Sequence, residues 1–344
     1  MRTSLRGLLL LGAIGFATAS PAAAQQIFYV AGYGGSFEQT IRKEVIPAFE
    51  SRNNVRVEYV AGNSTDTLAK LQAQRANQQI DVAFMDDGPM YMAIQLGFCA
   101  PITSLPADDI VQAARFPNDR AVGVGIVGTG LMYNTQYFKE RGWAPPTSWN
   151  DLADPKYRQL IVIPPINNTY GLHTLVMFAR MNGGGEANIE PGFKAMKERV
   201  NPNVLAYEPS PGKMTELFQS GQAALAVWGS ARVASFAVTG FPVDFVFPKE
   251  GTVTLLASIC PIAKQTVSQT AQAFVRAVVE PELQALLARE YGYGPVNKRA
   301  PIDPAAMPMA PVGERAAQLL NVDWDVINQN RDAWTRRWNR EVER

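Results

Sequence analysis

The stretch that decides the fold is residues 27–36, IFYVAGYGGS, an apolar run that ends in a glycine-rich turn. The apolar part predicts a short buried strand, and the glycines with Ser36, a good N-cap residue, predict a turn into a helix. Apolar residues then recur every four positions from Phe37 to Phe49, which is one face of an α-helix. This stretch therefore predicts a strand, a tight turn and a helix.

The same pattern repeats outward from this stretch. Residues 55–59 alternate between apolar and polar as a strand does, residues 64–71 are helical in pattern, and residues 80–85 are a short buried-type strand. Strands that alternate with helices predict an α/β fold with a parallel sheet. A second block has strand-like runs and helical runs of its own, which are residues 131–133, 160–163, 170–181, 223–228, 243–247, 269–279 and 322–343. No repeat or low-complexity linker separates the two blocks, so we expect two packed lobes.

The first 24 residues have the layout of a cleavable signal peptide. Arg2 and Arg6 precede an apolar core of leucines, and residues 22–24 give an A-x-A cleavage site. We therefore expect cleavage after Ala24 and a mature protein that works outside the cytoplasm, in the periplasm. This location argues against functions that need cytoplasmic ATP or a nicotinamide cofactor.

Composition narrows the function further. Loss of Arg2 and Arg6 with the leader changes the formal net charge from +1 to −1. A nearly neutral chain offers no electrostatic footprint for nucleic acid or an anionic membrane. Two cysteines, Cys99 and Cys260, could form a disulfide or remain buried thiols, and the sequence leaves both open. His173 is the one histidine, so a zinc site or a serine–histidine pair is poorly supported, and no metal or cofactor is expected.

Polar and aromatic residues follow several of the predicted strands, where open α/β sheets bind ligands. Gly34, Gly35 and Ser36 could offer backbone amides to an anion, with Tyr33 as a flat face for stacking, or could simply form a tight turn. Asp86 and Asp87 end the next strand, so we expect one of them to cap the following helix and the other to face a cleft, where it could hold an ammonium group.

The second block carries a similar set of residues. Asn168, Thr169 and Tyr170 follow one strand, and Trp228 and Arg232 follow another. Arg232 is either a clamp for a ligand carboxylate or an ordinary surface arginine.

One glycine pattern requires a separate interpretation. Residues 123–128, GVGIVG, fit the dinucleotide fingerprint G-x-G-x-x-G, which needs a helix that starts inside it. The residues that follow are strand-like instead, so a glycine-rich strand or hinge is the favoured interpretation.

Several longer segments resemble the periplasmic solute-binding proteins of ABC transporters, closest to the spermidine/putrescine-binding type. These segments are TSWNDL (147–152) with PKY (155–157), LAVWGS (225–230), FPKEG (247–251), and GY (292–293) with PVN (295–297). The resemblance implies a two-lobed, type II-like α/β fold with crossing strands between the lobes and a ligand enclosed by hinge closure. It also implies a permease as partner, a monomer and no enzymatic activity.

The resemblance also implies lobe boundaries and pocket residues. Lobe 1 would hold residues 25–124 and 257–300, and lobe 2 residues 128–254 and 304–344, with crossings near 123–128, Leu255 and Ala300. Tyr33, Trp228 and Tyr293 match aromatic pocket positions of the family. Where polyamine binders place anchoring acids, this chain has Ile-Asn-Asn-Thr at 166–169 and Leu-Leu-Ala-Ser at 255–258.

Desolvated ammonium groups each need a carboxylate partner, so the missing acids argue against a polyamine. The expected ligand is instead a small amine-bearing or zwitterionic organic molecule held by Asp86 or Asp87 and Arg232. Two alternatives stay open. One is ferric iron, for which Tyr291 and Tyr293 are the nearest tyrosine pair, and the other is an exported hydrolase, which the lone histidine and the lack of G-x-S-x-G make weak.

Overall fold

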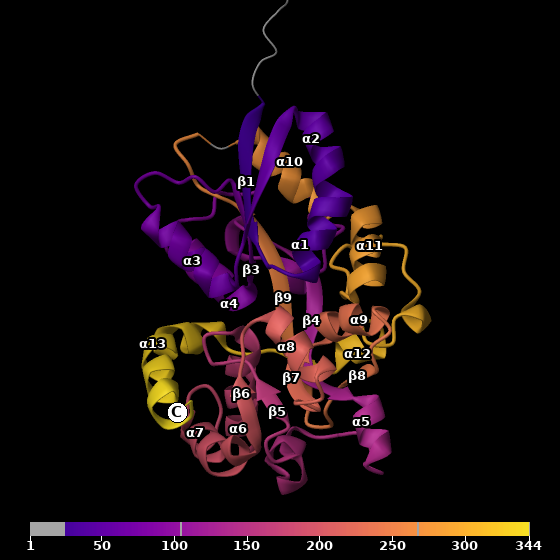
Figure 1. Ribbon diagram of the computed structural model, residues 1–344. Helices are drawn as coiled ribbons and strands as arrows, with labels where there is room; N and C mark the ends of the chain where they lie inside the picture. Colours follow the sequence, from indigo (N-terminus) through magenta and orange to yellow (C-terminus); the bar gives the residue numbers. More distant parts are fainter. Residues whose placement is uncertain (1–24, 104, 267, 344) are drawn as a thin grey trace, which may run out of the picture.

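The fold is a β-sheet covered by α-helices (Figure 1). A computed structural model describes residues 25–103, 105–266 and 268–343. The predicted signal peptide, residues 1–24, lies outside the described residues. The strands are β1 (Gln26–Gly32), β2 (Val55–Ala61), β3 (Val82–Asp86), β4 (Val122–Asn134), β5 (Ile161–Ile163), β6 (Val204–Tyr207), β7 (Leu225–Gly229), β8 (Val243–Val246), β9 (Thr252–Pro261) and β10 (Leu319–Leu320).

The α-helices alternate with these strands along most of the chain (Figure 1). They are α1 (Ser36–Thr40), α2 (Ile46–Asn53), α3 (Ser64–Ala73), α4 (Asp87–Gln95), α5 (Thr135–Glu140), α6 (Thr169–Met181), α7 (Glu190–Ala195), α8 (Pro211–Gln219), α9 (Ser230–Val238), α10 (Gln269–Val278), α11 (Pro281–Tyr291), α12 (Glu314–Ala317) and α13 (Trp324–Glu341). The fold class predicted from the sequence is confirmed.

The strands join into one sheet in the order β2-β1-β3-β9-β4-β7-β5-β6, with β10 beside β9 and β8 beside β4. β1, β2 and β3 are parallel, as predicted, whereas β9 enters beside β3 in the antiparallel direction. β4 and β9 pair antiparallel from Val122–Ile259 to Thr129–Val253, and these two long strands connect the two ends of the sheet. In Figure 1 they run down the middle of the molecule, between the upper and the lower group of helices.

Two main bodies of core residues lie at the two ends of β4 and β9. The first packs around β1, β2 and β3 and includes Val127 and Leu255, and the second packs around β5 and β7 and includes Leu131 and Val253. A further cluster packs the other side of β7 against α8 and α9. The molecule is therefore two-lobed, and the glycine-rich residues 123–128 lie on β4, one of the two connecting strands. They form a strand with no helix inside, so the dinucleotide pattern is a false match.

One local prediction at the first helix is wrong, which is that Ser36 is the N-cap. Gly35, with φ 72°, is the N-cap of α1, and Ser36 is the first helical residue. A positive φ strains any residue with a Cβ, so the glycine is required at the turn and displaces the serine from the capping position. A π-helical turn over Ile41–Val45 follows α1, and Pro47 falls in the first turn of α2, where its missing N–H costs nothing.

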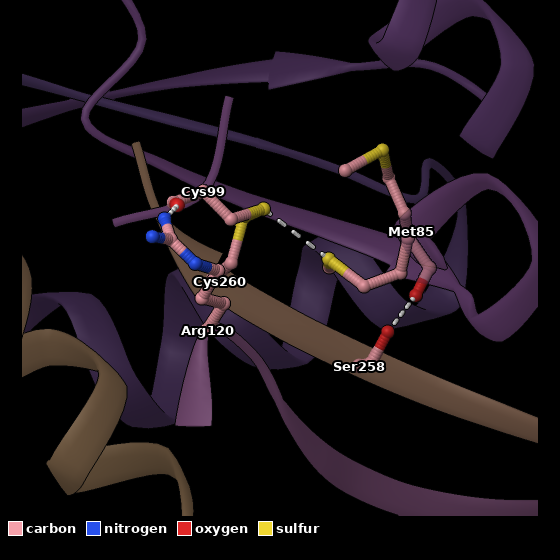
Figure 2. Close-up of a disulfide and its surroundings, with 6 residues drawn as sticks. Met85, Cys99, Arg120, Ser258 and Cys260 are labelled. Atoms are coloured by element: carbon pink, nitrogen blue, oxygen red, sulfur yellow. Dashed lines mark hydrogen bonds between the residues drawn. A yellow bond between two sulfur atoms is a disulfide. The ribbon is translucent and has the colours of Figure 1, made fainter. Parts of the chain in front are cut away.

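The two cysteines form a disulfide, Cys99–Cys260, with their Cα atoms 5.6 Å apart (Figure 2). The bond ties the segment after α4 to the end of β9, and both cysteines are fully buried. Arg120 donates a hydrogen bond of 2.7 Å to the Cys99 carbonyl, and the Ser258 hydroxyl donates one of 2.6 Å to the Met85 carbonyl on the neighbouring strand. The disulfide lies in the first lobe and does not line the cavity described below.

Candidate ligand-binding site

A cavity of about 620 Å³ lies between the two lobes. It is open to solvent on one side and is lined by the carboxyl ends of strands and the first turns of the helices that follow. Its lining residues are Tyr33, Gly34, Gly35, Glu38, Ala61, Gly62, Asn63, Ser64, Asp66, Asp86, Val127, Asn167, Asn168, Thr169, Tyr170, Pro209, Ser210, Pro211, Gly212, Trp228, Ala231, Arg232, Leu255, Ala257, Tyr291 and Tyr293.

The structure brings ten of the twelve candidate site residues to this cavity. Those that line it are Tyr33, Gly34, Gly35, Asp86, Asn168, Thr169, Tyr170, Trp228, Arg232 and Tyr293. Ser36 and Asp87 do not line it. Ser36 turns into the body of α1, and Asp87 lies one helical residue beyond Asp86, where its side chain is buried behind the cavity wall.

Asp86 is the acidic group at the centre of the lobe 1 wall. It ends β3, and its backbone N–H donates to the Ser64 hydroxyl at 3.0 Å. The Thr169 hydroxyl, from the other lobe, donates a hydrogen bond to its carboxylate. Burial raises the pKa of Asp86, while the polar groups of Thr169, Tyr33 and Ser64 and the charge of Arg232 oppose that rise. The expectation that one of the two aspartates caps α4 is wrong, because Asp86 occupies the N-cap position without a side-chain cap bond and Asp87 is the first helical residue. The Asp86 carboxylate is directed to the cleft instead.

Arg232 is the basic group of the opposite wall. It extends from the first turn of α9 across the cleft, where its Nη1 donates a hydrogen bond of 3.2 Å to the Gly34 carbonyl. Its charge lowers the pKa of the Tyr170 hydroxyl, although burial outweighs this effect and leaves that pKa raised. The Arg232 guanidinium therefore lies in the cleft and is not an ordinary surface group.

Aromatic rings form the remaining walls. Trp228 and Tyr170 lie 5.1 Å apart between ring centroids, and Tyr291 and Tyr293 lie 5.7 Å apart. The approach of Tyr170 depends on Gly229, because a Cβ at that position would lie 2.2 Å from the Tyr170 hydroxyl oxygen. Burial raises the pKa of Tyr33 well above its usual range, and the neighbouring Asp86 raises it further. The tyrosines are thus neutral hydrogen-bonding groups with apolar faces.

Some lining residues were missed from the sequence. Residues 61–64 lie at the carboxyl end of β2 and just after it, and the general position of sites at strand ends would have identified them. Residues 209–212 follow β6, a four-residue strand that has no clear alternation and was not predicted. Tyr291 ends α11 and was considered only as a ligand of iron.

His173 is a packed residue of the interior. It is fully buried on α6, its Nδ1 shares a hydrogen bond of 2.8 Å with the Thr129 hydroxyl, and it does not line the cavity. Burial, with the charges of Arg331 and Arg180, lowers its pKa to about 3. In the described ranges, no three His, Cys, Asp or Glu side chains gather as a metal site would require.

Asp87 gives a testable pH effect. Burial, and then the charge of Asp86, raises its pKa to about 7, above the ordinary value of 3.8. The folded state therefore binds this proton more tightly than the unfolded chain does. The contribution of Asp87 to the free energy of unfolding is fully present below pH 4 and is lost as the pH rises through 7. Asp87→Asn removes this pH-dependent loss of stability. We expect the change that it causes in the free energy of unfolding to be more favourable at pH 8 than at pH 5 by at least about 1 kcal/mol.

Urea denaturation at the two pH values measures this effect. The control is Asp325→Asn, which removes an exposed carboxylate at the start of α13 and so measures the effect of deleting one aspartate charge that is not buried. Equal effects of Asp87→Asn at pH 5 and pH 8 would contradict the raised pKa.

Residues 44–311 match the sequence profile of the bacterial extracellular solute-binding proteins. An uncharacterised protein of Haemophilus influenzae is 27% identical over 308 residues, which is 86% of this chain and 85% of that one. The spermidine/putrescine-binding periplasmic protein of Escherichia coli is 27% identical over 157 residues, 45% of this chain and 44% of that protein.

The fold is also that of solved periplasmic binding proteins. The protein AfuA of Actinobacillus pleuropneumoniae, solved with fructose-6-phosphate bound, superposes with a TM-score of 0.78 at 20% identity and covers 93% of this chain and 99% of its own. Within the described part of this chain, no helix is both long and apolar enough to cross a membrane. Because the matched profile spans most of the chain and the fold agrees with it, the chain belongs to the bacterial extracellular solute-binding protein family.

Proposed function

We propose that this protein is the periplasmic solute-binding component of an ABC importer that captures a small zwitterionic or amine-bearing organic molecule. The observation that carries this proposal is that Asp86 and Arg232 line one cavity from opposite lobes, with aromatic rings around them. A ligand that has an ammonium group and a carboxylate could pair with both.

Charge compensation favours such a ligand over the ligands of the relatives. A polyamine needs a carboxylate for each desolvated ammonium group, and the chain has Asn167, Asn168 and Thr169 where its polyamine-binding relatives are expected to place acids. A sugar phosphate, as in AfuA, would suit Arg232 but would leave the partly desolvated Asp86 facing an anion. A zwitterion compensates both charges.

The contacts between lobes support a proposal of hinge closure. The Thr169 hydroxyl bonds to Asp86, and Arg232 bonds to the Gly34 carbonyl, so the lobes already touch across the cleft. We propose that residues 25–124 with 257–300 move as lobe 1 and residues 128–254 with 304–344 as lobe 2, about the strands β4 and β9. The closed monomer would then deliver its ligand to a membrane permease.

Ferric iron is a weaker alternative for this cavity. Iron in a tyrosine site is bound by phenolates, and burial raises the pKa of both Tyr291 and Tyr293, which opposes ionisation. A coloured complex on addition of ferric citrate would favour iron and contradict the proposal.

A thermal-shift screen of the protein from Gln25 onward tests the proposal. The compounds are diamines, α- and ω-amino acids, betaines, dicarboxylates, sugar phosphates and ferric citrate. A ligand that binds only the folded state raises the melting temperature according to its excess over Kd. We expect shifts with zwitterions or monoamines, whereas shifts restricted to dicarboxylates or sugar phosphates would overturn the assignment of Asp86 as an ammonium partner.

Trp228 provides a test of the aromatic wall. Its indole is 95% buried beside Tyr170, so Trp228→Ala removes a large apolar contact surface from the cavity. We expect the Kd of the ligand identified by the screen to rise more than tenfold in calorimetric titration, about 1.4 kcal/mol. Trp228→Phe retains a ring and should change the Kd by less than about threefold. Unchanged affinity in a folded Trp228→Ala protein would remove Trp228 from the site.

A further inference from the structure

A second polar cluster lies behind the ligand cavity, where α4 of lobe 1 meets α13 of lobe 2. Asn328 of α13 donates a hydrogen bond of 3.2 Å to the Gly88 carbonyl, and the Trp324 ring lies against Gly88 so closely that a Cβ there would be 2.4 Å from it. α4 packs in the core of the first lobe through Met90 and Ala93, whereas α13 packs in that of the second through Ile327 and Trp338. Any rotation of one lobe against the other therefore moves this contact.

Arg331 is the unusual member of the cluster. Its guanidinium lies 6.0 Å from the centroid of the Trp324 ring and is attracted by Asp86 and Asp87. All three of its nitrogens are sealed from solvent, and none has a hydrogen-bond partner among the described residues. Asn328 Oδ1 and His173 Nε2 are sealed and unpaired in the same way.

Unpaired buried groups of this kind cost free energy, and a buried charge costs the most. Asp86 and Asp87, whose charges act on the guanidinium, lie at the end of β3 and the start of α4 in lobe 1, whereas Arg331 lies on α13 in lobe 2. The surroundings of the guanidinium therefore depend on how the two lobes are arranged. When the lobes rotate, water can reach the guanidinium, and the cost falls. The cost therefore belongs to the arrangement described here, in which Thr169 and Arg232 make contacts across the cleft.

We propose that Arg331 is a positioning residue that lowers ligand affinity from outside the cavity. It opposes closure of the lobes until ligand binding supplies the free energy that closure requires. The proposal rests on the proposed function, in which the lobes close around a ligand. The cross-cleft bonds of Thr169 and Arg232 favour closure, and the unpaired guanidinium opposes it. A ligand that binds only the closed arrangement loses affinity in proportion to the fraction of protein that is not closed.

Small-angle X-ray scattering of the ligand-free protein tests this without knowledge of the ligand. Arg331→Met keeps the length of the side chain and removes its charge and its donors. We expect the variant to have a smaller radius of gyration than the wild type, closer to the value calculated from the structure described here, in which contacts across the cleft are made. Arg331→Lys, which keeps a buried cation, and Arg336→Met, which removes an exposed arginine from the same helix, should both match the wild type. Equal radii of gyration for Arg331→Met and the wild type would overturn the proposal.

Ligand titration gives the second measurement. With the compound identified by the thermal-shift screen, Arg331→Met should bind about threefold or more tightly than the wild type, although Arg331 does not line the cavity. Weaker binding, with circular dichroism unchanged, would overturn the proposal. If Arg331→Met does not fold, Arg331→Gln, which is neutral and polar, takes its place in both measurements. Failure to find a zwitterionic ligand would contradict the proposed function but would leave the scattering result intact as a test of Arg331.

Discussion

Asp86→Asn is expected to weaken binding of the amine-bearing ligand by about 30-fold or more. The amide can still accept a hydrogen bond from the Thr169 hydroxyl, so the cross-cleft contact is retained. What is lost is the negative charge opposite the ammonium group in a partly desolvated cavity, and removal of one partner of such a pair costs about 2–5 kcal/mol. Calorimetric titration with the ligand identified by the thermal-shift screen measures the change.

The neighbouring acid is the matched control for this variant. Asp87 has the same chemistry one position along the chain, but it does not line the cavity. We expect Asp87→Asn to change the Kd by less than about threefold at neutral pH. If Asp87→Asn instead weakened binding as much as Asp86→Asn, the ammonium group would not be held by the cavity wall as described. An unchanged Kd for Asp86→Asn would exclude an ammonium partner at this position.

Much of the fold could be predicted because periodicity and burial act locally. The strand at 27–31 and the helix after it follow from their apolar spacing, and helices such as α10 and α13 were placed within two residues of their observed ends. The antiparallel entry of β9 beside β3 could not be predicted from pattern, because a buried strand has the same composition in either direction. The two cysteines are 161 positions apart, so their meeting depends on that tertiary pairing and not on local sequence.

The site could be predicted in part for one physical reason, which is that strand ends in an α/β sheet converge on the same edge. This reasoning placed Asp86 and Arg232 each near a strand end, and the resemblance to two-lobed binding proteins placed them on opposite sides of one cleft, where the structure has them. It could not separate Asp86 from Asp87, because one residue of helical rotation decides which side chain enters the cleft. It also gave no indication of Arg331, whose role depends on contacts between α13 and α4 that no local pattern encodes.

Loss of the disulfide is expected to give the largest change in stability. We predict that Cys99→Ala/Cys260→Ala lowers the free energy of unfolding by about 2–4 kcal/mol and the melting temperature by about 5–10 °C. The disulfide closes a loop of 161 residues, and cross-linking positions this far apart restricts the unfolded chain strongly. Alanine fits the fully buried positions without leaving two thiols in contact. Thermal unfolding followed by circular dichroism measures the loss.

Treatment with a reductant distinguishes the stability that comes from the S–S bond from the stability that comes from packing of the sulfur atoms. Dithiothreitol should lower the melting temperature of the wild type towards that of the double variant and should leave the double variant unchanged. Neither cysteine lines the cavity, so ligand affinity measured below the melting temperature should be the same in both proteins. A wild type that is insensitive to reductant even after unfolding and refolding would show that the bond does not contribute to stability. Lost affinity in the folded double variant would show that the bond holds β3 and β9 in register at the cleft, because Cys260 pairs with Ala83, three residues before Asp86.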